Sequence, residues 1–124
     1  MGAVKVASLA RVGFWLCVLI VLYVSLVPGN LRPHTGTSGH VEHFVAYAAT
    51  AFLFSQGSRL RDGLICALSL TALSGAVEIV QVYVPGRTGE FAGFFYSTLG
   101  TWLGLFFGAL AWSAWLTRRT GKRV

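Results

Sequence analysis

Four long apolar runs make up most of this chain, and only short polar turns separate them. The runs extend over about residues 12–28, 41–56, 63–84 and 91–116. A helix needs ~20 apolar residues to cross ~30 Å of hydrocarbon, and the runs are close to this length, although the second is short and begins with polar residues. The sequence therefore predicts an all-α fold, with residues 1–124 forming a single domain built as a four-helix transmembrane bundle.

The composition favours lipid as the solvent of this bundle. Hydrophobic residues make up 55% of the chain and charged residues only 11%, whereas about a quarter of the residues in a soluble domain are charged. The formal net charge of +6 would suit nucleic acid, but no basic stripe with interleaved aromatic residues is present. Cys17 and Cys66 lie inside apolar runs without metal-ligand spacing. We therefore expect the lipid bilayer as a partner, no nucleic acid and no cofactor.

The basic residues predict the orientation of the bundle. Two precede the first run, two lie between the second and third runs and four follow the last run, so eight of the ten share one side. These eight residues are Lys5, Arg11, Arg59, Arg61, Arg118, Arg119, Lys122 and Arg123. Because Lys and Arg concentrate in cytoplasmic loops, we expect both termini to be cytoplasmic.

The end of the third run, GAVEIVQVYVPGRTGEF (75–91), contains the residue that most needs explanation. Glu78 lies seven residues before Pro85, which corresponds to about 10 Å along a helix axis. It would therefore lie below the lipid headgroups, where an ionisable side chain is costly and is usually paired, protonated or functional. Gln81 follows three residues later, on the same helix face.

This topology gathers all the histidines and glutamates of the chain on the outer side, together with Gln81 and Arg87. They are His34, His40, Glu42, His43, Glu78, Gln81, Arg87 and Glu90. We expect His43 and Tyr47, four apart on the second run, to face Glu78 on the third run, with Arg87 folding back over them. The candidate pocket comprises His43, Tyr47, Glu78, Gln81, Arg87 and Glu42. The alternative interpretation is a structural polar cluster that only fixes helix register in lipid.

Neither a metal site nor a catalytic set stands out. The segment HVEH (40–43) carries two histidines with Glu42 between them. Two histidines and a carboxylate are ligands that zinc often uses, but no HExxH pattern accompanies them. No G-x-S-x-G elbow occurs either. We therefore expect no metal, leave the catalytic residues unassigned, and expect His34 and His40 to be solvated in a loop.

The fourth run carries a packing signal made of glycines. Gly100, Gly104 and Gly108 recur every four residues, and Gly93 lies seven residues before the first of them. Such small residues let two helix backbones approach closely in lipid. The expected partner is the third run of the same chain, which offers Ala72 and Ala76. A second protomer, which would make the protein an oligomer, is the alternative.

Four motifs together resemble the VanZ-like family of small bacterial membrane proteins. They are HFVAY (43–47), EIVQ (78–81), PGRTGEF (85–91) and STLGTWLG (97–104), and their order and spacing agree over residues 28–108. The family is named after a protein linked to low-level resistance to the glycopeptide teicoplanin. The resemblance implies a multi-pass protein of the bacterial inner membrane, without an established reaction.

The resemblance covers some polar positions and not others. His43, Glu78, Gln81 and Arg87 match polar residues of the family. The family usually has Asp and Asn where this chain has Gly93 and Ser97. It also commonly has an Asp-Lys pair where this chain has Gly39 and His40.

These observations lead to one main hypothesis and two alternatives. The main hypothesis is a cell-envelope protein whose outward polar pocket binds a polar lipid, cell-wall or glycopeptide-type ligand. The first alternative is a small proton-coupled multidrug-type transporter that uses Glu78. The second is an envelope metal-dependent hydrolase that uses His43.

Overall fold

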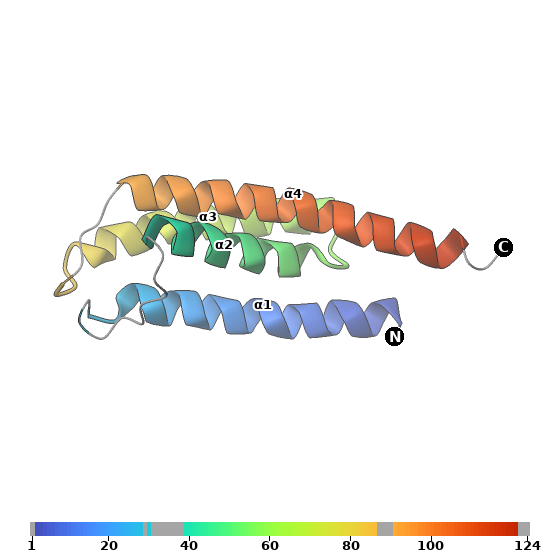
Figure 1. Cartoon of the computed structure of the whole chain (residues 1–124), viewed down its shortest axis with the longest axis horizontal. Helices are drawn as coiled ribbons and strands as arrows, with labels where there is room; N and C mark the ends of the chain where they lie inside the picture. Colours follow the sequence, from blue (N-terminus) through green and yellow to red (C-terminus); the bar gives the residue numbers. More distant parts are fainter. Residues whose placement is uncertain (1, 29, 31–38, 87–90, 122–124) are drawn as a thin grey trace.

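The described residues form an all-α structure. The computed structural model describes residues 2–28, 30, 39–86 and 91–121. Within them the helices are α1 (Ala3–Leu26), α2 (Gly39–Ser55), α3 (Leu60–Gln81) and α4 (Phe91–Gly121), and no strand occurs. The helices run alongside one another, with the start of α1 and the end of α4 at the same end of the molecule (Figure 1). The predicted fold class, all-α, is confirmed.

The helix ends differ from the predicted bounds where charged or turn residues are involved. Helix α1 begins at Ala3 rather than at residue 12, because Lys and Arg are good helix formers and do not interrupt it. Helix α4 continues to Gly121, with Arg118 and Arg119 in its last turn, where basic side chains interact favourably with the helix dipole. Helix α3 ends at Gln81 rather than at residue 84. Beyond Gln81 the backbone changes to tighter turns ahead of Pro85.

Three of the helices, α1, α3 and α4, are long and apolar enough to cross a membrane. Helix α2 has 17 residues, a length of about 26 Å, which is shorter than the ~30 Å of bilayer hydrocarbon. Large apolar side chains are exposed along the outside of α1 and α4: Leu19 is 63% exposed and Phe106 is 57% exposed. Surfaces of this kind are unusual in soluble monomers and suit contact with lipid.

Helices α2 and α4 pack backbone against backbone through the glycine stripe. Gly100 faces the backbone carbonyl of Phe44, and Gly104 faces that of Ala48. At Gly108 an added Cβ would lie 2.9 Å from the carbonyl oxygen of Phe52. Real Cβ atoms essentially never come within 3.0 Å of another heavy atom, so only glycine permits this approach.

The predicted partner of the glycine stripe was therefore wrong. The stripe packs within the chain, as preferred, but on α2 rather than on α3. Ala72 and Ala76, the small residues expected to receive it, are exposed on α3. Because Gly100, Gly104 and Gly108 are buried against α2, a second protomer would have to displace α2 to reach them.

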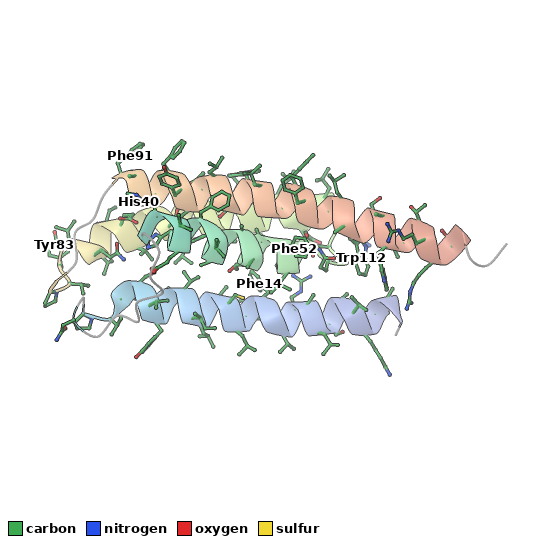
Figure 2. The ribbon with its side chains drawn as sticks, in the orientation of Figure 1. Phe14, His40, Phe52, Tyr83, Phe91 and Trp112 are labelled. Carbon is green, nitrogen blue, oxygen red and sulfur yellow. The ribbon has the colours of Figure 1, made fainter. Side chains whose placement is uncertain are left out.

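The core of the bundle lies where the four helices converge. Its buried members are Phe14, Val21, Tyr47, Ala51, Cys66, Ala67, Leu70 and Leu105. Figure 2 shows Phe14 of α1 on the side of that helix facing the other helices, and His40 near the end at which α2 and α4 begin. Helix α3 ends at this same end of the bundle (Figure 1), so the polar residues of the three helices can meet there.

Candidate functional site

A histidine of α2 and a glutamate of α3 meet near this end of the bundle. His43 Nδ1 lies 3.7 Å from Glu78 Oε1. Their side chains are only 17% and 11% exposed, so water screens the pair weakly. When the imidazole is protonated, the two groups form an ion pair, which lowers the cost of keeping a carboxylate in an apolar bundle. The structure thus brings together the two residues that the sequence analysis expected to face each other.

Helix α4 completes the surroundings of the pair with two small residues. Ser97 is fully buried, and its Oγ lies 3.3 Å from His43 Nδ1. Gly93 leaves room for the carboxylate, because a Cβ at this position would lie 2.8 Å from Glu78 Cδ. Gly93 was expected to continue the packing stripe, but its contact is with the side chain of Glu78. Ser97 was not among the predicted site residues. A signal for positions 93 and 97 was present in the sequence comparison above, because the VanZ-like family usually has the polar residues Asp and Asn there.

Tyr47 lies one helical turn beyond His43 and is only 2% exposed. Its hydroxyl has no hydrogen-bond partner among the described residues, and Glu78 is close enough to affect it electrostatically. A buried hydroxyl without a partner costs free energy. The Tyr47 hydroxyl is therefore a buried polar group that the described residues leave unsatisfied.

Gln81 does not join the His43–Glu78 pair, although it is buried. Its Nε2 donates a hydrogen bond of 2.9 Å to the backbone carbonyl of Ser25 in the last turn of α1. The last four carbonyls of a helix have no partner within that helix. Gln81 thus ties the end of α1 to α3, and its role is to position α1.

The remaining predicted residues have separate locations. Glu42 is half-buried in the first turn of α2, where a carboxylate interacts favourably with the helix dipole. His40 was expected to be solvated in a loop, but it lies in α2 and stacks on Tyr96, with ring centroids 5.1 Å apart and planes 9° from parallel. Arg87 lies outside the described residues, as do His34 and Glu90.

The geometry fits binding better than covalent chemistry. Ser97 Oγ and Glu78 Oε1 both approach the same imidazole nitrogen, Nδ1 of His43. A nucleophilic triad instead uses the two ring nitrogens for the two partners, and its serine must reach the substrate. In residues 2–28, 30, 39–86 and 91–121, no three His, Cys, Asp or Glu side chains are grouped so that they could hold a metal ion.

The cluster lies a short distance inside the bundle. Glu78 is three residues before the end of α3, and His43 is four residues after the start of α2. These positions are about 5–6 Å from the helix ends. The pair therefore lies about one helical turn from this end of the bundle.

No family model, curated protein or solved structure matches the chain. The likeness to the VanZ-like family therefore depends on the four motifs quoted above.

Proposed function

We propose that the chain is a VanZ-like protein of the bacterial inner membrane, with both termini cytoplasmic. Its outward-facing polar cluster binds a polar lipid, cell-wall or glycopeptide-type ligand. The orientation is supported by the basic residues at the ends of α1 and α4 and in the turn between α2 and α3. The polar cluster lies at the opposite end, which this orientation exposes to the outer side.

The observation that carries the proposal is the weakly exposed Glu78 carboxylate beside His43, together with the Tyr47 hydroxyl, which has no hydrogen-bond partner among the described residues. A carboxylate is an acceptor, and a phenol hydroxyl can donate or accept a hydrogen bond. The ligand group that suits both is a hydroxyl, amide or ammonium group that donates to the carboxylate. Lipid headgroups, cell-wall precursors and glycopeptides all carry such groups. Each charge-assisted hydrogen bond of this kind contributes about 1.5–3 kcal/mol.

The two alternatives receive less support from the same geometry. A metal-dependent hydrolase needs a ligand set, and the described residues contain no group of three potential ligands. A proton-coupled transporter needs a carboxylate that exchanges a proton for a substrate, and the Glu78 side chain is only 11% exposed, beside His43 and Gly93. We therefore favour a binding role for the carboxylate.

The test is direct binding to the purified protein in lipid nanodiscs. The probes are a fluorescent teicoplanin derivative and a lipid-linked disaccharide-peptide cell-wall precursor. We expect at least one probe to bind, and Glu78→Gln to weaken that binding by tenfold or more. Arg61→Gln is the control, because it also removes a charge, but at an exposed position at the opposite end of the bundle.

Two results would contradict this function. The first is that neither probe binds the wild-type protein, or that binding is equal in the Glu78→Gln variant. The second is pH-driven uptake of a cationic dye into vesicles that Glu78→Ala abolishes, which would favour the transporter.

A further inference from the structure

A second candidate site, largely apolar but with two charged residues, lies at the other end of the bundle from the His43–Glu78 cluster. A cavity of about 490 Å³ opens there between α1, the end of α2 and the first half of α3. Its lining residues are Arg11, Phe14, Trp15, Phe54, Asp62, Ile65, Cys66, Ser69 and Leu70. The volume is within the ~300–1,000 Å³ of ordinary ligand pockets.

Arg11 is held in a fixed position at the mouth of this cavity. Its Nη2 donates a hydrogen bond of 2.8 Å to Ser58 Oγ in the turn between α2 and α3. Its guanidinium also lies 4.0 Å from the centre of the Phe54 ring. An arginine has five N–H donors, so these contacts orient the group and leave donors for an anionic ligand.

Asp62 supplies the opposite charge in the same cavity. It is exposed in the first turn of α3. Within the described part of the chain, no ion pair joins Asp62 to Arg11 or joins either of them to another residue. The mouth of the cavity thus presents one cation and one anion that do not neutralise each other.

The rest of the cavity is apolar and runs toward the middle of the bundle. Along α3 the lining continues from Asp62 to Leu70, a distance of about 12 Å. Phe14 and Trp15 line it along α1, one turn beyond Arg11. The polar end is level with the α2–α3 turn, which the proposed orientation of the bundle places among the lipid headgroups of the cytoplasmic side. The cavity therefore has the polarity of an amphiphile that lies parallel to the helices.

We propose that this cavity binds one phospholipid with a zwitterionic phosphoethanolamine headgroup. The phosphate accepts hydrogen bonds from Arg11, the primary ammonium donates to Asp62, and an acyl chain lies along the apolar lining. A phosphatidylglycerol headgroup has no cation for Asp62, and the methylated ammonium of phosphatidylcholine has no N–H to donate. Both lipids should therefore bind more weakly than phosphatidylethanolamine.

The experiment is native mass spectrometry of the full chain released from nanodiscs that contain equal amounts of phosphatidylethanolamine, phosphatidylcholine and phosphatidylglycerol. We expect retained phosphatidylethanolamine to exceed each of the others by about tenfold, the effect of one charge-assisted hydrogen bond. Asp62→Asn should remove the preference over phosphatidylglycerol. Arg11→Gln should lower the occupancy of all three lipids by about tenfold. Arg61→Gln is the matched control, because its exposed side chain lies outside the cavity lining, and it should change nothing.

Three results would overturn the proposal. Equal retention of the three lipids by the wild type would identify ordinary surface lipid. Selectivity that survives in Asp62→Asn and Arg11→Gln would place the lipid elsewhere. Soluble phosphoethanolamine that displaces the lipid at equal concentration would show that the headgroup alone is bound. Because Asp62→Asn should change which lipid is retained, its effect is distinguishable from a loss of folding.

Discussion

The close packing of α2 on α4 predicts a large effect for a single methyl group at Gly104. A Cβ added there would lie 2.8 Å from both the carbonyl carbon and Cα of Ala48, and closer still to its carbonyl oxygen. Ordinary contact begins at 3.4 Å, so the shortfall is at least 0.6 Å. The obstructing atoms belong to the backbone and cannot rotate away. In Gly104→Ala the two helices must move apart along their shared face, and we expect a loss of about 2–3 kcal/mol of unfolding free energy.

Gly75→Ala provides the matched control for this prediction. A Cβ at Gly75 would meet only the Phe94 ring, at 3.4 and 3.6 Å, which is ordinary contact. Alanine is also the better helix former by about 0.5–1 kcal/mol, so this variant should be neutral or slightly stabilised. The assay is reversible unfolding in mixed micelles with increasing SDS, followed by far-UV circular dichroism. Equal unfolding free energies for the two variants would refute the backbone contact between α2 and α4.

Three further predictions concern the cluster, the attachment of α1 and the topology. Gly93→Ala should displace the Glu78 carboxylate, because its Cδ would lie 2.8 Å from the new Cβ. Ligand binding should therefore fall as in Glu78→Gln. Since the Glu78 side chain can rotate away from the new methyl group, the unfolding free energy should change by less than about 1 kcal/mol. Gln81→Leu removes the 2.9 Å hydrogen bond to the backbone carbonyl of Ser25, so the unfolding free energy should fall by about 1–2 kcal/mol. Amide hydrogen exchange in the last turn of α1 should become faster, and an unchanged exchange rate would contradict this prediction. A cytoplasm-active reporter fused after Val124 should be active and a periplasm-active reporter inactive; the reverse result would invert the topology.

The sequence was sufficient to predict which helices exist, because the apolar runs and their Gly and Pro breaks are local features. It was also sufficient to predict that His43 faces Glu78, since both residues lie near the same end of the bundle and a carboxylate inside a membrane needs a partner. It did not predict how far each helix is rotated about its axis. A period of 3.6 residues specifies a face but not the neighbour that this face contacts.

Two residues show this limitation. Ala72 suggested α3 as the partner of the glycine stripe, but Ala72 is exposed, and the stripe instead meets the backbone of α2. Gln81 shares a broad helix face with Glu78. Three residues along the helix nevertheless turn its side chain far enough from that of Glu78 to reach Ser25 in α1. The partner of each side chain depends on the packing of the whole bundle, which local patterns do not specify.

The most direct test of the account is a distance between the imidazole of His43 and the carboxyl group of Glu78 in the membrane. Solid-state NMR of protein with ¹⁵N-labelled histidine and ¹³C-labelled glutamate, reconstituted in lipid bilayers, measures the dipolar coupling between these groups. A separation of 3.7 Å between Nδ1 and Oε1 predicts a clear coupling that disappears in Glu78→Gln. No coupling in the wild type, or a coupling that persists in Glu78→Gln, would contradict the cluster on which the proposed function rests.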